Sequence, residues 1–298
     1  MDKIRGAGVA IVTPFKNNNL VDYNGLEKLI NHVINGGINY LVLLGTTGES
    51  TTLADSEKVK VLDFCKKVNN GRLPIVIGIG GNNTNKVIAD LKLFNLVGVD
   101  AILSVSPSYN KPSQNGIFNH YKLVSNASPL PIILYNVPSR TSSNISANTI
   151  LRLANEFNNI VAVKEASGDL DQIMQIIKNK PKNFSVLSGD DSLTLPMIYM
   201  GAEGVISVIG QVYPNIFSKM VHYGISKNIK MANELHYKLY DIYFPLYQEG
   251  NPVGVKACLE ILGICKSYVR PPLLQASSFL KSNLKKVFFL KMMFNLFI

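Results

Sequence analysis

Short runs of apolar, mostly β-branched residues recur along the first two thirds of the chain at intervals of roughly 20 to 35 residues. Such runs are typical of strands buried on both faces, as in a parallel sheet covered by helices. They lie at residues 6–15, 40–44, 74–79, 101–105, 131–135, 160–164, 184–187 and 204–208. Apolar positions at helical spacing follow each run. The pattern therefore predicts eight strand–helix units, the α/β arrangement of a (β/α)8 TIM barrel.

The glycines after the third run allow a second interpretation. Gly78, Gly80 and Gly81 resemble part of a dinucleotide-binding loop, which would favour a doubly wound open sheet. The fingerprint is incomplete, and no acidic residue closes a following strand in the expected place. We therefore interpret these glycines as a tight strand–helix loop.

The last third of the chain has a different pattern. Only helical periodicity remains, at residues 214–223, 229–247, 253–262 and from 273 onward. We therefore expect a catalytic barrel over residues 1–225 and a small helical domain over residues 226–298. The segment 287–298 is apolar nearly all round but too short to span a membrane, so we expect it to pack on the barrel or on another subunit.

Composition narrows the class of protein. The chain has 30 Lys and Arg against 20 Asp and Glu, which by itself would fit a polyanion partner. No basic run exceeds two residues, so we expect a solvated basic surface and neither a nucleic-acid nor a membrane partner. The cysteines, Cys65, Cys258 and Cys265, lack metal-ligand spacing, and no apolar signal core follows Met1. We expect a cytoplasmic protein without metal or cofactor.

Lys164 ends the sixth apolar run and is the first candidate for chemistry. Strand alternation places Ile160, Ala162 and Lys164 on one face. If that face lines the barrel interior, the apolar enclosure disfavours the charged ammonium, and the neutral amine becomes a nucleophile for a carbonyl group. The alternative is a lysine that reaches solvent or pairs with Glu165. This segment alone leaves both interpretations open.

Polar residues also follow several of the other runs. In a TIM barrel the active site forms at the carboxyl ends of the strands. The residues at these ends include Thr46, Thr47, Tyr109, Tyr135, Arg140, Lys164 and Gly189. Each side chain also has a structural interpretation, as a turn residue, a packed ring or a surface charge. Their shared position at five strand ends favours a site.

The residue types in this set suit a carbonyl reaction without a metal. A neutral lysine forms an imine with a keto acid, and the derived enamine is a carbon nucleophile. A tyrosine nearby relays protons, and an arginine fork binds a carboxylate. The four histidines fall within helical patterns, so we interpret them as packing or surface residues. Glu49 and Asp190 have no neighbours in the sequence that mark a metal site.

Several of these segments resemble signatures of the dihydrodipicolinate synthase family. The matching segments are 45–50, 135–141, 163–168, 187–191, 204–207 and 251–256. They occur in order and at consistent spacing from about Gly6 to Pro271. The resemblance implies an enzyme of lysine biosynthesis that condenses pyruvate with aspartate 4-semialdehyde to give 4-hydroxy-tetrahydrodipicolinate.

The resemblance also implies roles for individual residues. Lys164 would form the imine with pyruvate, and Tyr135 would be the proton-transferring phenol. Thr47 would connect Tyr135 to Tyr109. In family tetramers, which are dimers of dimers, that last tyrosine comes from the neighbouring subunit across a tight dimer interface.

The substrate-binding residues follow from the same resemblance. Thr46, Thr47, Gly189 and the carbonyl of Ile206 would hold the part derived from pyruvate. Arg140 would hold the carboxylate of the semialdehyde. The related N-acetylneuraminate lyases share the barrel, the glycine–threonine loop and the lysine but lack a matching arginine, so a sugar-acid aldolase is the alternative enzyme. A catalytically idle barrel with a binding or assembly role is the alternative outside enzymes.

The sequence departs from the family pattern at two places. In relatives inhibited by lysine, the dimer interface carries an effector pocket, and the matching positions here are Lys58, Lys86 and Ser108. Two cations there should repel the ammonium of free lysine, so we expect weak or absent inhibition by lysine. The segment after Pro272 also matches poorly.

Overall fold

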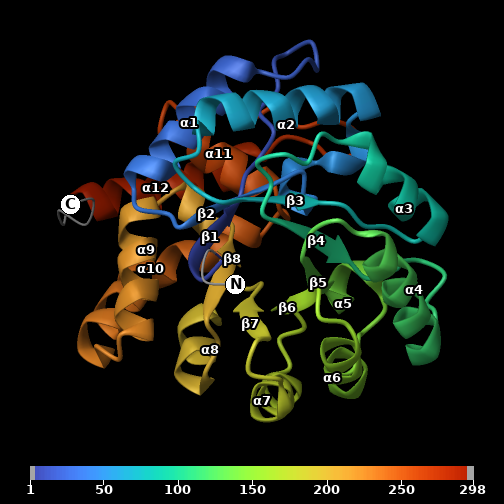
Figure 1. Ribbon diagram of the computed structural model, residues 1–298. Helices are drawn as coiled ribbons and strands as arrows, with labels where there is room; N and C mark the ends of the chain where they lie inside the picture. Colours follow the sequence, from blue (N-terminus) through green and yellow to red (C-terminus); the bar gives the residue numbers. More distant parts are fainter. Residues whose placement is uncertain (1–3, 294–298) are drawn as a thin grey trace.

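The computed structural model describes residues 4–293, with side chains as far as Phe288. Eight parallel strands close into one barrel and pair in the order of the chain, β1 with β8 closing the ring (Figure 1). They are β1 (Gly6–Ala10), β2 (Tyr40–Leu43), β3 (Ile75–Gly78), β4 (Ala101–Val105), β5 (Ile132–Asn136), β6 (Ile160–Glu165), β7 (Ser185–Ser188) and β8 (Gly204–Ser207). The predicted TIM barrel is confirmed.

Helices surround the strands, as the periodicity predicts (Figure 1). They are α1 (Tyr23–Asn35), α2 (Asp55–Asn69), α3 (Thr84–Leu93), α4 (Gln114–Ala127), α6 (Ala147–Glu156), α7 (Leu170–Asn179), α8 (Thr194–Met200) and α9 (Pro214–Ile225). Shorter turns of helix lie in the loops after β2, β5 and β8: η1 (Thr46–Gly48), η2 (Ser50–Thr52), α5 (Pro138–Thr141) and η3 (Ile209–Gln211). These loops carry several of the candidate site residues.

Strand alternation divides the core into two layers. Outward-facing residues such as Leu41, Val163 and Val205 pack against the helices, while inward-facing residues such as Tyr40 and Ala162 fill the barrel. The fully buried Tyr40 ring occupies the space beside β1, where a Cβ on Gly8 would lie 2.1 Å from the ring. Glycine at this position therefore lets one large ring fill the barrel.

Local signals at the first helix are also confirmed. The Asp22 side chain accepts a hydrogen bond from the backbone of Gly25, and α1 ends at Asn35, directly before Gly36. The strand is shorter than the first apolar run predicts, because β1 ends at Ala10 and the remaining residues of the run belong to the loop. The loop residues are apolar because they are buried, as Val12 is. The Val12 N–H donates to the side chain of Gln211 instead of to a neighbouring strand.

Three further helices follow the barrel: α10 (Ile229–Tyr247), α11 (Val253–Ile261) and α12 (Ser278–Met293). Helix α10 packs along α9 on one flank of the barrel (Figure 1). The α12 side chain of Phe288 is 4% exposed and stacks on Tyr213 at 5.5 Å, so this part of the apolar tail packs on the chain itself. The rest of the segment 287–298 lies outside the residues with described side chains.

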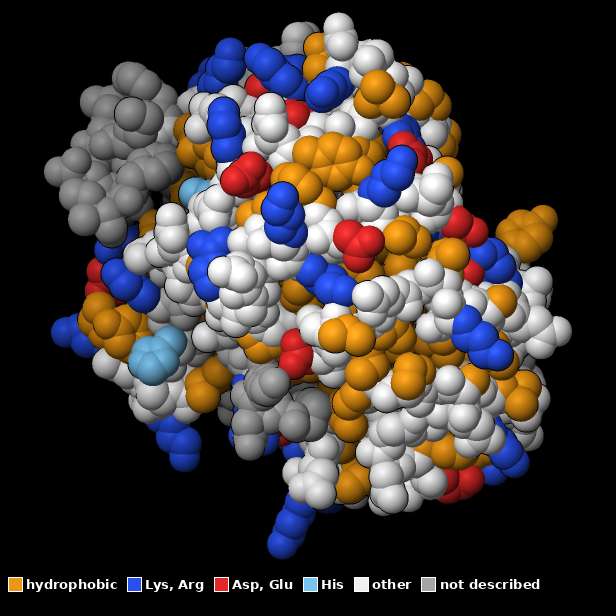
Figure 2. Space-filling model, turned by 45° about the horizontal axis from the view of Figure 1, so that its top comes forward, with side chains coloured by type: hydrophobic (Ala, Val, Ile, Leu, Met, Phe, Trp, Pro, Cys, Tyr) orange, Lys and Arg blue, Asp and Glu red, His pale blue; other side chains and the backbone are white. Residues whose placement is uncertain are grey.

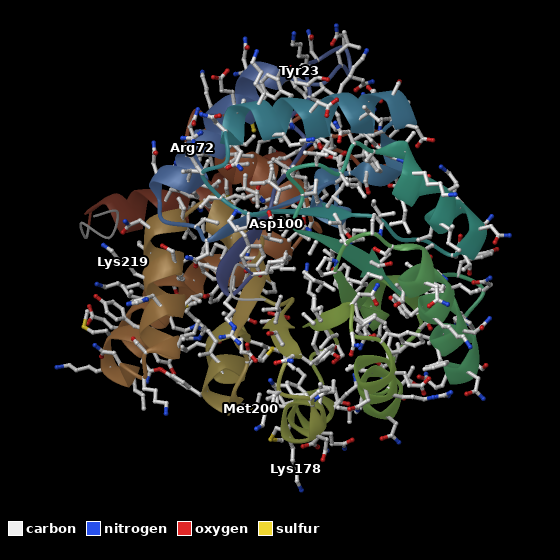
Figure 3. The ribbon with its side chains drawn as sticks, in the orientation of Figure 1. Tyr23, Arg72, Asp100, Lys178, Met200 and Lys219 are labelled. Carbon is white, nitrogen blue, oxygen red and sulfur yellow. The ribbon has the colours of Figure 1, made fainter. Side chains whose placement is uncertain are left out.

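On the face that Figure 2 shows, the basic residues are distributed rather than clustered. Figure 2 shows Lys and Arg side chains over the visible face with acidic and apolar groups among them. Lys178 on α7 and Lys219 on α9 extend away from the barrel (Figure 3). This distribution agrees with a solvated surface. Within the described residues, no helix is long and apolar enough to cross a membrane.

Candidate functional site

The Lys164 side chain lies inside the barrel mouth. It belongs to β6 and is 5% exposed, and its Nζ atom is 4.3 Å from the centroid of the Tyr135 ring. The two residues are register partners on β5 and β6, so the sheet itself brings them together. Lys164 neither reaches solvent nor pairs with Glu165, whose carboxylate bonds other groups on the opposite face. The pair leaves an amine against the face of a phenol ring, an arrangement that favours cation–π contact.

Backbone groups enclose the lysine on its other side. A Cβ on Gly189 would lie 3.0 Å from Lys164 Cε and 2.6 Å from Ala166 Cβ, so only glycine leaves room for the lysine to extend. The Gly189 N–H donates to the Glu165 carbonyl at 2.7 Å. Ile206 on β8 is 1% exposed and shares the inner cluster with Tyr135. The barrel thus brings Gly189, Ile206 and Tyr135 around one amine.

The loop after β2 supplies the two threonines. Thr46 is exposed and, together with Gly80 and Tyr135, lines a cavity of about 230 Å³ at the mouth. Thr47 is 3% exposed, and its Oγ1 atom accepts a hydrogen bond from the Asn251 side chain at 2.9 Å. The glycines of the third strand–helix loop therefore form part of the mouth.

Tyr109 is not part of the mouth within a single chain. Its ring is 90% exposed and its φ is +71°, an uncommon backbone conformation for a residue with a side chain. Thr47, by contrast, is buried and bonded to Asn251. The structure therefore does not bring Tyr109 to Thr47 in one subunit.

Arg140 lies on the rim in the short helix α5. Its side chain is exposed, and Nη2 donates to the Asn251 carbonyl at 3.4 Å. Asn251 thus contacts both Thr47 and Arg140, yet the sequence offered only its place in a matching segment. Its Oδ1 atom is buried and has no hydrogen-bond partner among the described residues. An unpaired acceptor between Thr47 and Arg140 is suited to a ligand that donates a hydrogen bond.

A network of neutral donors surrounds Glu165 behind the Lys164–Tyr135 pair. The fully buried carboxylate accepts hydrogen bonds from Asn136 Nδ2 at 3.0 Å, Ser167 N–H at 2.9 Å and Gln172 Nε2 at 3.1 Å. Burial raises the pKa of Glu165, while these hydrogen bonds oppose the rise. Asn136 also accepts from the Ile145 N–H. The network therefore fixes Asn136 and Glu165, the strand residues that follow Tyr135 and Lys164. It also fixes Ile145, where the loop that carries Arg140 ends.

A buried ion pair lies behind the Thr47 loop. Lys256 of α11 donates to the carboxylate of Glu49, with side chains 0% and 2% exposed, and also to the Tyr268 carbonyl at 2.8 Å. Burial lowers the pKa of Lys256, and the Glu49 carboxylate opposes this change. Glu49 thus has a structural partner that lies too far along the chain for sequence spacing to indicate.

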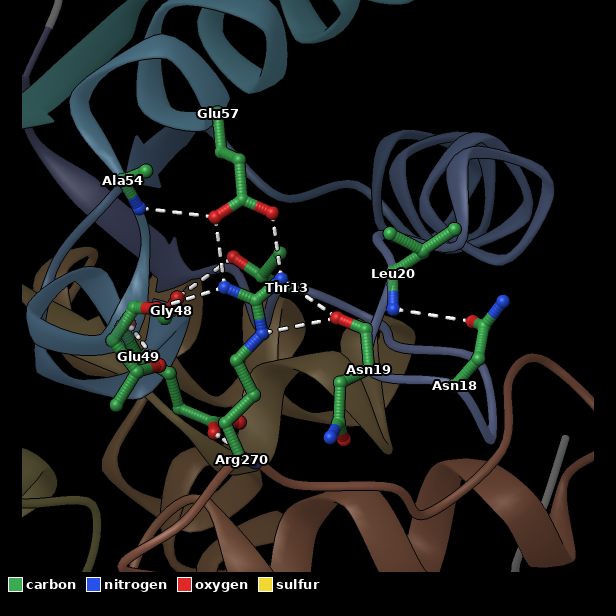
Figure 4. Close-up of polar contacts among 10 residues, drawn as sticks. Thr13, Asn18, Asn19, Leu20, Gly48, Glu49, Ala54, Glu57 and Arg270 are labelled. Carbon is green, nitrogen blue, oxygen red and sulfur yellow. Dashed lines mark hydrogen bonds and ion pairs between the residues drawn. The ribbon is translucent and has the colours of Figure 1, made fainter.

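Arg270 extends this contact to the surface. Its N–H donates to Glu49 Oε2 at 3.0 Å, and its guanidinium bonds both oxygens of Glu57 at 2.8 and 2.6 Å (Figure 4). The same group donates to the carbonyls of Asn19 and Thr52. Arg270 therefore connects the segment between α11 and α12 to the loops after β1 and β2.

The histidines and cysteines of the chain lie in helices or in the core rather than at the barrel mouth. The four histidines lie in helices, and the described His, Cys, Asp and Glu side chains form no group of three that could hold a metal. The three cysteines are free and buried. The site is built from an amine, hydroxyls, a guanidinium and backbone groups.

Known proteins share both the sequence and the fold. The chain matches the dihydrodipicolinate synthetase family over residues 3–289. It is 51% identical to the 4-hydroxy-tetrahydrodipicolinate synthase of Flavobacterium psychrophilum, over 95% of this chain and 97% of the relative. The crystal structure of dihydrodipicolinate synthase from Aquifex aeolicus matches with a TM-score of 0.92 at 41% identity, covering 98% of each chain. A structure described as a monomeric dihydrodipicolinate synthase variant matches with a TM-score of 0.93 at 37% identity, covering 96% of each chain.

Proposed function

This chain belongs to the dihydrodipicolinate synthetase family, and on that premise we propose that Lys164 forms an imine with pyruvate at the barrel mouth. The activity is that of a 4-hydroxy-tetrahydrodipicolinate synthase, a lyase of the class I aldolase type. It condenses pyruvate with L-aspartate 4-semialdehyde in lysine and diaminopimelate biosynthesis. The sugar-acid aldolase and the idle barrel are not favoured, because the curated relatives carry the synthase name. The observation that carries the role of Lys164 is its buried amine 4.3 Å from the Tyr135 ring centroid.

The proposed reaction begins with the amine of Lys164, which must give up a proton before it can act as a nucleophile. It attacks the keto carbon of pyruvate, and water leaves as the imine forms. Loss of a proton from the methyl group gives an enamine, whose carbon attacks the aldehyde carbon of the semialdehyde. The aldehyde oxygen takes up a proton and becomes the hydroxyl. The amino group of the semialdehyde then attacks the imine carbon and displaces Lys164, which closes the ring and frees the amine.

Tyr135 is the proposed proton carrier for these steps. Its ring lies against the Lys164 amine and its side chain is 7% exposed, so few water molecules compete for the transferred proton. Thr46, Thr47, Gly189 and the Ile206 carbonyl are the proposed ligands of the pyruvate-derived part. Support comes from the position of Gly189 against Lys164 and of Ile206 beside Tyr135.

Arg140 is the proposed ligand of the semialdehyde carboxylate. It is exposed at the rim, and among the described residues its guanidinium donates one hydrogen bond, to the Asn251 carbonyl. A guanidinium that is not paired with a carboxylate keeps its fork for a ligand. Its position beside Asn251 supports a second substrate that enters from the rim.

A homotetramer built as a dimer of dimers is the proposed assembly, with Tyr109 completing the site of a neighbouring subunit. Two exposed apolar surfaces support it. One is the loop that carries Tyr109, 90% exposed, and the other is the α10 stripe of Tyr237, Tyr240 and Phe244, exposed by 67%, 60% and 77%. Large exposed rings at two separate places fit two kinds of subunit contact.

We also propose the cytoplasm as its compartment and a division into a barrel, residues 1–225, and a helical domain, residues 226–298. The free, buried thiols support the first proposal. The absence of strands after β8 in the described part of the chain supports the second.

Borohydride reduction in the presence of pyruvate tests the role of Lys164. We expect a pyruvate-derived adduct on the peptide that contains Lys164 and none in Lys164→Arg, whose guanidinium stays protonated. An adduct on another lysine, or none at all, would contradict the proposal. Assays with aspartate 4-semialdehyde and with N-acetylmannosamine measure the choice of second substrate, and we expect turnover only of the semialdehyde.

Light scattering together with activity tests the assembly. We expect the wild type to be a tetramer and Tyr240→Lys to shift it toward dimers, because a charge replaces part of the α10 stripe. Tyr109→Phe should keep the assembly and lower kcat. A wild-type monomer with full activity would contradict the role of Tyr109.

A further inference from the structure

The Asp191 carboxylate joins three elements beside the mouth. It follows β7 and is 1% exposed. Its Oδ1 atom accepts from Ser207 Oγ at 2.6 Å, and its Oδ2 atom accepts from the Ile209 N–H at 2.8 Å and the Tyr247 hydroxyl at 2.5 Å. The Val208 N–H lies 3.2 Å from both oxygens. One buried side chain therefore connects the β7 loop, the β8 loop and the end of α10.

These partners are neutral donors rather than cations. Burial raises the pKa of the Asp191 carboxyl, and the hydrogen bonds from Ser207, Tyr247 and Ile209 oppose that rise. Hydrogen bonds to a carboxylate are shorter and stronger than those between neutral groups. A buried carboxylate with four donors therefore holds each of them in a narrow range of positions.

The donors on the β8 side directly follow Ile206. Ser207, Val208 and Ile209 all bond to Asp191, so the peptide after Ile206 cannot rotate without breaking these contacts. Ser207 Oγ also accepts from the Gly210 N–H at 2.9 Å, which closes the turn. The direction of the Ile206 carbonyl is thus coupled to Asp191.

The chain on the β7 side connects Asp191 to Lys164. Gly189 lies two residues before Asp191, and a Cβ there would be 3.0 Å from Lys164 Cε. Asp191 therefore anchors both backbone segments that approach the amine, one through Gly189 and one through Ile206.

Tyr247 adds the helical region to this arrangement. It is the last residue of α10, and a cavity of about 470 Å³ lies beside it, lined by Gly189, Tyr243, Phe244 and others. The end of α10 therefore borders open space next to the site. The bond from Tyr247 to Asp191 limits its movement into that space.

We propose that Asp191 is a positioning residue for pyruvate, which fixes the Gly189 and Ile206 backbones around Lys164, and that Tyr247 extends this control to α10. The inference rests on the proposed imine chemistry of Lys164 and concerns groups that do not react themselves. Tyr247 then acts on the two backbone segments through its hydrogen bond to Asp191. Loss of the Tyr247 hydroxyl should therefore weaken pyruvate binding in the same direction as a change at Asp191, but by a smaller factor.

Asp191→Asn tests the proposal with little change of shape. The amide NH2 group of asparagine takes the place of one carboxylate oxygen. It is a donor, so it faces other donors and the hydrogen bonds that this oxygen accepted are lost. We expect the pyruvate concentration for half-maximal borohydride trapping, and KM for pyruvate, to rise about tenfold, which is the effect of losing one such bond. KM for the semialdehyde should stay within about twofold, and Tyr247→Phe should raise the pyruvate values about threefold.

Asp100→Asn is the matched control. Asp100 accepts from the Ile75 N–H at 3.0 Å at the amino ends of β3 and β4, which is the end of the strands opposite the mouth. We expect it to lower the unfolding midpoint without changing the pyruvate values. Unchanged pyruvate values in folded Asp191→Asn, or in Tyr247→Phe if the first variant does not fold, would overturn the inference. A wild type without an adduct on Lys164 would instead overturn the proposed function.

Discussion

Glu165 and Glu49 are both buried beside the mouth, but partners of different kinds hold them. Glu165 accepts from Asn136, Ser167 and Gln172, all neutral and all within 29 residues of it. Glu49 binds the Lys256 ammonium and the Arg270 N–H, which lie 207 and 221 residues away. One carboxylate belongs to the Lys164 side of the mouth and the other to the Thr47 side.

This difference shows that the two sides depend on different parts of the fold. The Glu165 network on the Lys164 side is complete once β5, β6 and α7 have formed, because its donors lie on or between these elements. The Thr47 side also requires α11 and the segment around Arg270 to dock. The Lys256–Glu49 ion pair forms part of this docking contact. The Thr47 side therefore depends strongly on both residues, because loss of one leaves the other buried and without a counter-charge.

Removal of the cation from the Thr47 side should have the largest effect. Lys256→Met leaves Glu49 buried without its counter-charge, so we expect a loss of about 3–5 kcal/mol in the free energy of unfolding. Glu165→Gln keeps a neutral side chain among neutral donors and should lose only about 1–3 kcal/mol. Urea unfolding of both variants measures the difference.

The double variant Lys256→Met with Glu49→Gln is the control for charge. It removes the unpaired carboxylate and should recover part of the lost stability. Equal losses in Lys256→Met and Glu165→Gln would show that the two carboxylates are held in the same way.

Asn251 lies where the Thr47 loop meets Arg140, so its removal should affect one substrate more than the other. Asn251→Ala deletes the unpaired Oδ1 acceptor beside Arg140 as well as the bond to Thr47, so we expect KM for the semialdehyde to rise about tenfold, the equivalent of one hydrogen bond. Trapping of pyruvate on Lys164 should weaken less, by about threefold, because Thr47 keeps its place in the loop and is one of four proposed ligands of pyruvate. Steady-state kinetics and borohydride trapping measure the two effects.

Gln248→Ala, an exposed change at the end of α10, is the matched control and should leave both values unchanged. If Asn251→Ala weakens pyruvate trapping as much as it weakens semialdehyde binding, the two sides of the mouth are not separate.

A fall in pH should change the contributions of Glu57 and Glu165 to the free energy of unfolding in opposite directions. The Arg270 guanidinium lowers the pKa of Glu57 to about 2, so the stability from this pair is present above the usual value of 4.5 and is lost as pH falls toward 2. Burial raises the pKa of Glu165, so its contribution is present below about 4.5 and is lost as pH rises through the raised value.

Unfolding free energies of Glu57→Gln and Glu165→Gln, each subtracted from the wild type across this pH range, measure the two slopes. The difference for Glu57 should grow with pH from 2 to 4.5, and that for Glu165 should fall above 4.5. Slopes of the same sign would contradict the assignment.

The sequence predicted the Lys164 side better than the Thr47 side, and the structure explains why. The inward direction of Lys164 follows from strand alternation, and its place beside Tyr135 from the pairing of consecutive strands. The Lys256–Glu49 pair joins residues 207 apart through packing, for which no local period exists. The ring of Tyr109 is 90% exposed among the described residues, so packing within one chain does not indicate its role.

Element ends were harder to predict than elements for a related reason. The run 6–15 stays apolar beyond β1 because buried loop residues, such as Val12, pack as tightly as strand residues. Helix α12 begins at Ser278 rather than at residue 273, since helical spacing alone does not mark a first turn. Asn251 and Asp191 have roles defined by their partners, which only the fold brings near.

Free lysine should change the enzyme's rate least of all. The sequence predicts this from repulsion by two cations, but the structure gives a different reason. Lys58 and Lys86 both pair with Asp55, at 3.0 and 3.3 Å, and Lys86 also bonds Asp90. The two cations are therefore accompanied by two carboxylates, and simple repulsion does not describe this surface. The carboxylates that could bind the ammonium of free lysine already have partners, so a ligand must displace a side chain before it gains an ion pair.

This argument predicts that about 1 mM L-lysine leaves the rate nearly unchanged, since such exposed ion pairs add at most about 1 kcal/mol to binding. Lys86→Ala frees Asp90 and part of Asp55, so it should make the enzyme more sensitive to lysine, whereas Lys178→Ala on α7 should not. Half-inhibition of the wild type well below that concentration would show that the Asp55 cluster is not the obstacle. Asp55 lies two residues before Glu57, which Arg270 binds, so any lysine response would also be a property of the Thr47 side.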